Sequence, residues 1–453
     1  MNTLFTELRQ KNKTFSYNGF SAVRTEQGIT VTFDFALDGV CEFHPTTTVL
    51  TDNLNLLNDF DSPSAKSILF SLGMVELISY WKASCPETVF VRCGKLSEDD
   101  VLWWKKLWWG GLGEFFFRNN IQTDFDSFVQ VKSEGEEHTW QGCSTADFSL
   151  VPIGGGKDSD VTLSLLGERK GKIKCFTVND QAARTQGVLA AGLSEKDIVR
   201  TKRTIAPELL ELNRQGYLNG HTPFSAIVGF LGLYCAYLIG ATEVILSNES
   251  SANEASVVGQ EVNHQYSKSY EFEQDLNRYI ETHFGNFARY FSLLRCFNEL
   301  QIAAQFAALK QYHSVFVSCN VGSKKNIWCG HCAKCLFVYI ILSPFLSPEE
   351  LTNIFGSNLL DIEDLQNDFL GLTGQAESKP FECVGTVREV NAALAQTKKQ
   401  YLARGEKLPL LLRDYEADEP IQPLLNEFNE ENAVPDAFLP YAKEMYRYVS
   451  SLN

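Results

Sequence analysis

The sequence predicts an α/β protein built on a doubly wound parallel sheet, with an N-terminal α+β region before the sheet and a mainly helical C-terminal tail after it. Two observations indicate this fold class. From about residue 146, short apolar runs alternate with stretches of helical periodicity, the order that parallel strands joined by crossover helices produce. The chain is also 453 residues long, which is too long for one hydrophobic core. We therefore expect three regions, at residues 1–145, 146–345 and 346–453.

The N-terminal region contains a clear strand signal. Apolar residues occupy every second position from Ile29 to Leu37, and Asp38-Gly39 then supplies a turn. A tryptophan-rich stretch follows at Trp103, Trp104, Trp108 and Trp109. Because Trp104 and Trp108 would share one face of a helix, we interpret this stretch as core packing or a domain interface. The alternative is a wall for a sugar or nucleobase, with residues 111–120 as a substrate loop.

The middle region contains the alternation that predicts the sheet. Strands are expected at residues 148–153, 173–178, 197–201, 243–246 and 315–318, and helices at 159–166, 182–191, 224–239 and 297–309. The apolar runs at 224–240 and 335–342 are too short to span a membrane. We expect them to be helices buried against the sheet. The tail after about residue 346 is rich in leucine and charged residues and is expected to be mostly helical.

Composition limits the class of partner. The net charge is −16, with 40 basic against 56 acidic residues, so a nucleic acid is not expected as the main partner. No apolar signal segment is visible at the N-terminus, and no membrane association is expected. The chain has twelve cysteines, and we predict a protein of the reducing cytoplasm in which the clustered cysteines bind metal rather than form disulfides. The sequence specifies no oligomeric state.

A glycine-rich turn lies between the first strand and first helix of the middle region. It reads Gly154-Gly155-Gly156-Lys157-Asp158-Ser159. Glycines allow close approach of a ligand, and the N–H groups at a helix start favour an anion, to which Lys157 would add a positive charge. The turn is not a Walker loop, because Asp158 rather than Ser or Thr follows the lysine. We predict an anion site here; the alternative is a tight turn without a ligand.

A cluster of four cysteines comes late in the middle region. Cys319 is followed by Cys329, Cys332 and Cys335, which form two overlapping C-x-x-C steps. This spacing is typical of a closed, structural Zn²⁺ site with four thiolates. An iron–sulfur cluster and a catalytic thiol are the alternatives. His331 lies within the cluster but is not needed as a ligand.

Two polar stretches follow elements of the expected sheet. NGHTPFSA (219–226) contains His221, and Thr222 would cap the long buried helix with Pro223 as its first residue. VNHQYSKS (262–269) contains His264, Tyr266 and Lys268. Loops at the carboxyl ends of parallel strands line the ligand crevice of such sheets, so both stretches are candidate substrate contacts. Ordinary solvated loops are the alternative.

The glycine turn resembles the pyrophosphate loop of the N-type ATP pyrophosphatases, whose usual form is S-G-G-x-D-S. Gly154 stands where that family usually has serine, which removes one hydroxyl contact. The resemblance implies that Gly155, Gly156 and Ser159 hold pyrophosphate and that Asp158 helps to hold Mg²⁺. Members of this superfamily cleave ATP between the α and β phosphates and transfer AMP to a substrate oxygen. With the cysteines, the motif also looks like 7-cyano-7-deazaguanine synthase, whose chain is about half this length.

Taken together, the glycine turn, the two polar stretches, the cysteines and the stretch at 111–121 resemble one family over nearly the whole chain. It is the family of ATP-dependent UDP-N-acetylmuramoyl-L-alanyl-L-glutamate epimerases of bacterial peptidoglycan synthesis. The resemblance implies that ATP and Mg²⁺ activate the glutamyl carboxylate of a UDP-linked muramoyl dipeptide as an adenylate, after which a base removes the α-proton. Lys157 would stabilise phosphate charge, and the candidates for base and acid are His221, His264, Tyr266 and Lys268.

Three other functions are consistent with parts of the sequence. One is a carboxylate-adenylating synthetase that forms an amide or nitrile. A sulfur-transfer enzyme acting on tRNA is the second, although the acidic composition argues against it. The third is a regulatory module that binds a nucleotide without turnover.

Overall fold

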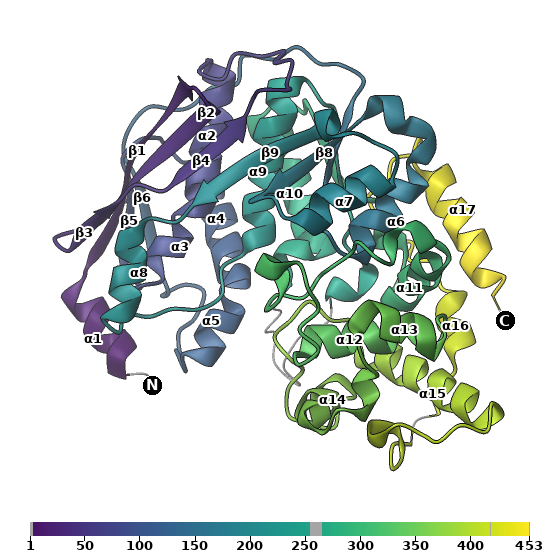
Figure 1. Cartoon of the computed structure of the whole chain (residues 1–453). Helices are drawn as coiled ribbons and strands as arrows, with labels where there is room; N and C mark the ends of the chain where they lie inside the picture. Colours follow the sequence, from purple (N-terminus) through teal and green to yellow (C-terminus); the bar gives the residue numbers. More distant parts are fainter. Residues whose placement is uncertain (1–2, 254–264, 417, 453) are drawn as a thin grey trace.

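The computed structural model describes residues 3–253, 265–416 and 418–452, and its strands form one large sheet (Figure 1). The strand order is β11-β10-β7-β8-β9-β4-β2-β1-β5-β6, and β3 pairs with β2 outside this path. The strands are β1 (Thr14–Thr25), β2 (Gly28–Leu37), β3 (Cys41–Phe43), β4 (Thr46–Leu50), β5 (Thr88–Val91), β6 (Gln130–Ser133), β7 (Ser149–Pro152), β8 (Ile173–Val178), β9 (Ile198–Thr204), β10 (Glu243–Leu246) and β11 (Arg289–Ser292). The protein is therefore a mixed α/β structure, as the sequence predicts.

Five neighbouring strands, β11-β10-β7-β8-β9, are all parallel. The chain enters this block at β7, continues outward through β8 and β9, and then returns to the other side of β7 through β10 and β11. This is the strand order of a doubly wound sheet, which reverses direction between β7 and β10. The strands expected near residues 148, 173, 197 and 243 are confirmed.

The expected strand at 315–318 is wrong. Val315 belongs to a turn and residues 316–318 are irregular and join no sheet; the N–H of Val317 donates one hydrogen bond to the carbonyl of Gly155, at 2.8 Å. The fifth parallel strand is β11, which the sequence analysis did not identify. A short apolar run has the same sequence pattern in a strand and in a buried loop. Whether it forms a strand depends on whether its backbone pairs with a neighbouring strand.

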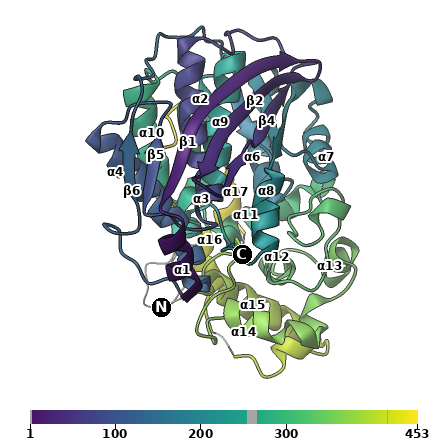
Figure 2. The same cartoon turned by 90° about the vertical axis from the view of Figure 1, so that its left-hand side faces the viewer.

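The N-terminal strands continue the same sheet. β4 pairs antiparallel with β9, so that Thr46 lies opposite Thr204. Figure 2 shows β1 and β2 as long, curved neighbours on this side of the molecule, and the shorter β4 pairs with β2. An ion pair reinforces the junction: Arg203 on β9 donates to both carboxylate oxygens of Glu76, at 2.6 and 2.8 Å, and both side chains are buried.

Helices cover both faces of the parallel block, as Figure 1 shows for α6 and α7 on one face and α9 and α10 on the other. The helices are α1 (Thr3–Lys11), α2 (Pro63–Glu76), α3 (Ile78–Trp81), α4 (Glu98–Gly111), α5 (Gly113–Arg118), α6 (Lys157–Leu165), α7 (Ala182–Ala190), α8 (Pro207–Arg214), α9 (Phe224–Ile239), α10 (Tyr270–His283), α11 (Glu299–Ala308), α12 (Ala333–Leu342), α13 (Pro348–Phe355), α14 (Gln366–Leu372), α15 (Val387–Ala403), α16 (Ile421–Leu425) and α17 (Leu439–Ser450). Successive strand residues point to opposite cores: Leu150 packs in one core and Val151 in the other.

The long apolar helix α9 is buried, as expected, and packs on α2 and on strands β7 and β10. None of the described helices is long and apolar enough to cross a membrane. In the tryptophan-rich stretch, Trp104 and Trp108 are completely buried on α4, which confirms the packing interpretation. The segment at 111–120 is not the expected loop, because Gly113–Arg118 form helix α5; contact of this segment with a substrate stays a prediction.

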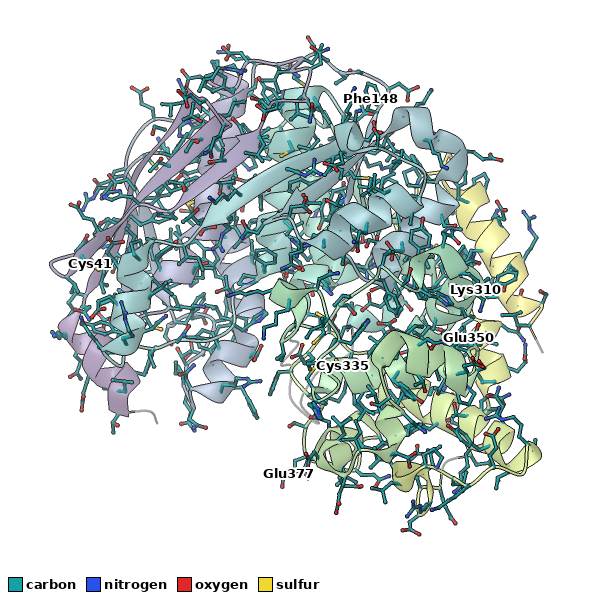
Figure 3. The ribbon with its side chains drawn as sticks, in the orientation of Figure 1. Cys41, Phe148, Lys310, Cys335, Glu350 and Glu377 are labelled. Atoms are coloured by element: carbon teal, nitrogen blue, oxygen red, sulfur yellow. The ribbon has the colours of Figure 1, made fainter. Side chains whose placement is uncertain are left out.

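The C-terminal tail is helical, as the sequence predicts. Helices α13 to α17 pack around α11 and α12 in the second core. Figure 3 labels one link between them, Lys310 after α11 and Glu350 on α13, whose Nζ and Oε1 atoms lie 2.5 Å apart. This packing fixes α11 and α12, both of which begin beside the cavity described below.

Candidate active site and metal centre

A cavity of about 350 Å³ opens at the carboxyl ends of β7, β8 and β10. It lies where the strand order reverses, the usual ligand position in doubly wound sheets. Its walls come from the glycine turn, the start of α9, Lys268, residues 317–320, Lys334 and Cys383. Segments that are far apart in the sequence therefore meet around one space.

The glycine turn is held close to its neighbours. Gly155 has a φ of +83°, and a Cβ there would lie 3.1 Å from the Cβ of Ala183; a Cβ on Gly156 would lie 3.0 Å from that of Ser318. Gly156 caps α6, and the hydroxyl of Ser159 donates to the Gly156 carbonyl at 3.0 Å. The first-turn N–H groups of α6 have no partner within the helix, so they can bind an anion. This geometry is compatible with the predicted anion site, which stays a prediction.

Lys157 is buried beneath this turn. Its ammonium contacts the carboxylates of Asp158 and Glu299, and both Lys157 and Glu299 are only 2% exposed. Burial alone would raise the pKa of Asp158, but Lys157, Lys334 and Lys268 together hold it below its ordinary value. Asp158 is therefore ionised and lines the cavity. Sequence reasoning missed Glu299, which comes 142 residues later and has no motif around it.

Two further lysines contribute positive charge at the cavity. Lys268 ends a short 3-10 turn (Tyr266–Lys268), and Lys334 is the second residue of α12. Burial alone would lower the pKa of Lys268, but Cys383, Glu249 and Asp158 raise it above its ordinary value. Lys334 is 7% exposed and donates to the main-chain carbonyl of Cys383. Sequence reasoning identified Lys268 but missed Lys334 and Cys383.

The other acid–base candidates lie elsewhere. His221 does not line this cavity, and its Nδ1 is 3.2 Å from Glu114. The ring of Tyr266 packs against Gly110 of α4, where an added Cβ would lie 2.6 Å from it. His264 falls outside the described residues. Of the candidates that the structure describes, Lys268 is the one brought to the glycine turn.

The loop at 219–223 also differs from its prediction. Pro223, not Thr222, occupies the N-cap of α9. The Thr222 hydroxyl instead accepts a hydrogen bond from buried Lys82, at 2.6 Å. The Thr222 side chain is thus engaged by Lys82 rather than by the helix, which begins one residue later than predicted.

The four clustered cysteines come together as predicted. The sulfurs of Cys319 and Cys332 are 3.9 Å apart, those of Cys329 and Cys335 3.7 Å, and those of Cys332 and Cys335 3.5 Å. Zn–S bonds of 2.3 Å in a tetrahedron require sulfurs about 3.8 Å apart. The N–H of Gly322 also donates a hydrogen bond to the Cys319 sulfur, at 3.1 Å, as backbone N–H groups do toward metal-binding thiolates. The four thiols can therefore hold a metal ion.

Comparison with known proteins gives consistent matches. The family models of the MurL N-terminal and MurL C-terminal domains match residues 6–293 and 315–419. A UDP-N-acetyl-alpha-D-muramoyl-L-alanyl-L-glutamate epimerase of Xanthomonas oryzae pv. oryzae is 34% identical over 347 residues, 75% of this chain and 76% of that protein. Proteins of the same name from a Micromonospora species and from Salinispora tropica are 33% and 34% identical. Each covers 81% of this chain, and the matches span 83% and 81% of those proteins.

Proposed function

Since the chain belongs to the MurL family, we propose that it is an epimerase that converts the terminal L-glutamate of UDP-N-acetylmuramoyl-L-alanyl-L-glutamate to D-glutamate. This would be a step of peptidoglycan biosynthesis. The observation that carries the proposal beyond family membership is the cavity at the strand reversal, where an anion cradle and two lysines meet.

We further propose that the reaction consumes ATP. The α-proton of a carboxylate is hard to remove, because the resulting anion would carry a second negative charge. Transfer of AMP to the carboxylate cancels its charge, so that the enolate can form and be stabilised. Reprotonation from the opposite face gives the D centre, and water then releases AMP. The first products are diphosphate and an acyl adenylate, as in the superfamily that the glycine turn resembles.

Different residues of the site would bind the diphosphate, bind Mg²⁺ and neutralise the buried carboxylates. The backbone of Gly155 and Gly156 and the first turn of α6, with Ser159, would hold the diphosphate. Asp158 fits Mg²⁺, which binds proteins through one or two carboxylates together with substrate phosphates. Lys157 would act mainly by neutralising Asp158 and Glu299, because its ammonium contacts both.

The cysteine cluster fits a structural Zn²⁺ ion. Four thiolates complete a tetrahedron and leave no open position for water, so the ion would pin residues 319–335 rather than react. Cys319 itself lines the cavity, so this loop supports one wall of the site.

The decisive experiment is incubation of the full chain with ATP, Mg²⁺ and the L-glutamyl muramoyl dipeptide nucleotide. We expect AMP and diphosphate to form, and D-glutamate to appear in the acid hydrolysate of the product. AMP without D-glutamate would instead identify a carboxylate-adenylating synthetase. No AMP with any L-glutamyl substrate would contradict the adenylation step.

A further inference from the structure

Arg184 is a cation of the cavity to which the proposed function assigns no role. It is the third residue of α7, and its half-buried side chain lines the cavity. An added Cβ on Gly155 would lie 3.2 Å from the Cγ atom of Arg184, so the stem of the arginine packs directly on the glycine turn. Sequence reasoning missed this residue, because an arginine near the start of a helix has no motif around it.

Two nitrogens of the Arg184 guanidinium are anchored on main-chain carbonyls. Nη1 donates to the carbonyl of Val178 and, at 2.8 Å, to that of Asn179, both at the carboxyl end of β8. Nε donates to the carbonyl of Gly154, the first residue of the glycine turn, at 3.4 Å. The guanidinium therefore bridges the end of β8 and the start of the glycine turn.

The charge of Arg184 has no acidic partner in the part of the chain that the structure describes. Its hydrogen bonds go to three neutral carbonyls, and its Nη2 atom donates none of them. The nearest acid along the chain, Asp180, pairs instead with Arg200, at 2.8 Å, and accepts a hydrogen bond from Thr185. An unpaired guanidinium at a cavity wall can bind an anion, and its fork of N–H groups matches the oxygens of a phosphate.

The position of Arg184 favours one phosphate of a nucleoside triphosphate. In the proposed function, the glycine turn and the start of α6 hold the two terminal phosphates. Apolar side chains of the cavity offer the surface that a nucleobase needs; they are Phe176, Val178, Val228 and Leu246. The α-phosphate joins these two parts of the nucleotide. The guanidinium is anchored between the glycine turn and β8, the strand that carries two of the apolar side chains.

We propose that Arg184 binds the α-phosphate of ATP and stabilises the transfer of AMP, an inference that rests on the proposed function. A carboxylate oxygen of the glutamyl group forms a bond to the α-phosphorus, and the bond from that phosphorus to the oxygen shared with the β-phosphate breaks. The electron pair of the broken bond leaves with diphosphate, and no proton is transferred. The guanidinium offsets the negative charge of the non-bridging α-oxygens, which otherwise repels the incoming carboxylate.

Arg184→Gln in the full chain tests this role, because the change removes the charge and the fork of N–H groups. We expect diphosphate release with ATP, Mg²⁺ and the L-glutamyl substrate to fall by about 10²- to 10³-fold. The Kd of inorganic diphosphate, measured by calorimetry with Mg²⁺, should not change, because the glycine turn binds that product. Arg200→Gln is the matched control, since Arg200 is paired with Asp180 and Glu195 and does not line the cavity.

Phosphorothioate nucleotides test which phosphate Arg184 contacts. ATPαS has two diastereomers, in which sulfur replaces one or the other non-bridging oxygen of the α-phosphate. Sulfur accepts hydrogen bonds more weakly than oxygen, so the wild-type protein should bind one diastereomer more tightly, even without the dipeptide substrate. Arg184→Gln should lose the part of this preference that the arginine supplies. Arg184→Lys should keep some of it, because an ammonium keeps the charge but not the fork.

Three results would overturn the proposal. The first is diphosphate release by Arg184→Gln at the wild-type rate, and the second is a preference between the diastereomers that this change leaves as it was. The third is an equal loss of diphosphate and ATP binding, which would place Arg184 at the terminal phosphates. If the wild-type protein binds ATPαS but forms no AMP with the substrate, the proposed function fails instead, while the comparison of diastereomers still decides the contact of Arg184.

Discussion

Lys157 shows how far a single residue can be interpreted from its motif. In the sequence it follows three glycines and precedes a helix, the position of a phosphate ligand. In the structure its ammonium contacts Asp158 and Glu299, and Lys157 does not line the cavity. Glu299 is the first residue of α11, so its approach depends on how that helix packs against α6. Motifs place backbones well, but the partner of a long side chain comes from tertiary packing.

Asp158→Asn tests the metal-binding role of this carboxylate. The change keeps the shape of the side chain but removes the charge, so Mg²⁺ and diphosphate should be held poorly. We expect substrate-dependent diphosphate release to fall by at least about 100-fold. Asp180→Asn is the control, because Asp180 is paired with Arg200 at 2.8 Å and does not line the cavity. Equal rates for Asp158→Asn and wild type would remove Asp158 from the mechanism.

The buried Lys82 should make the free energy of unfolding change with pH in the alkaline range. It is 6% exposed, and burial, with a smaller contribution from Arg203, lowers its pKa to about 8. The unfolded chain therefore binds this proton more tightly than the folded chain between about pH 8 and the ordinary lysine pKa of about 10.4. Within that window the free energy of unfolding should rise with pH. Lys82→Met removes this titration.

We expect wild type to gain up to about 3 kcal/mol relative to Lys82→Met between about pH 7.5 and pH 10.5. Chemical denaturation of both proteins at the two pH values measures this difference. Titration of other groups cancels in the comparison. A constant difference between the two proteins would show that Lys82 keeps an ordinary pKa.

At the scale of one element, the glycine turn offers a matched pair of substitutions. Gly155→Ala places a Cβ at positive φ and 3.1 Å from Ala183, whereas a Cβ on Gly154 has open space around it. We expect Gly155→Ala to cost about 1–2 kcal/mol of stability and to weaken ATP-dependent diphosphate release. Gly154→Ala should leave the stability unchanged. Thermal unfolding and diphosphate assays separate the two, and similar effects would contradict the cradle geometry.

In our proposal, the metal ion stabilises the fold of the loop that contains the four cysteines. Chelation, or Cys332→Ser, should remove one equivalent of Zn²⁺ and lower the melting temperature, because the binding energy of a structural ion adds to folding. Elemental analysis and a thermal melt measure both effects. Cys143→Ser should retain the metal. Freshly purified protein without zinc or iron would refute the site.

Helices and strands could be predicted from the sequence where the pattern of apolar residues was compatible with only one type of element. The strand at β8 and the helix α9 have the residues expected, because runs of apolar residues flanked by turn signals have few alternatives. β11 was missed because it is a four-residue strand that begins with an exposed arginine. The segment at 315–318 was assigned wrongly because its apolar residues pack in the second core without joining the sheet. Cys383 carries no local pattern, so only the fold of the tail could reveal it.

At the scale of the whole molecule, Arg203 and Glu76 join the N-terminal strands and helices to the parallel block. Removal of one partner leaves the other charge buried, so Arg203→Met should cost about 3–5 kcal/mol of stability. Arg200→Met should cost less, because the pair of Arg200 with Asp180 is more exposed. Chemical denaturation of the full chain measures both. Equal losses would mean that the junction is no stronger than a surface contact.

The pairing of β4 with β9 also has a consequence for how the chain is made. Thr46 meets Thr204, so β4 leaves the ribosome long before its neighbour in the sheet exists. At the usual rates of synthesis the delay is roughly 8 to 30 s. During that time the outer edge of β4, with its row of threonines at 46–48, has no strand beside it. The unpaired N–H and C=O groups of that edge can pair with another copy of the chain, so this interval exposes the nascent chain to aggregation.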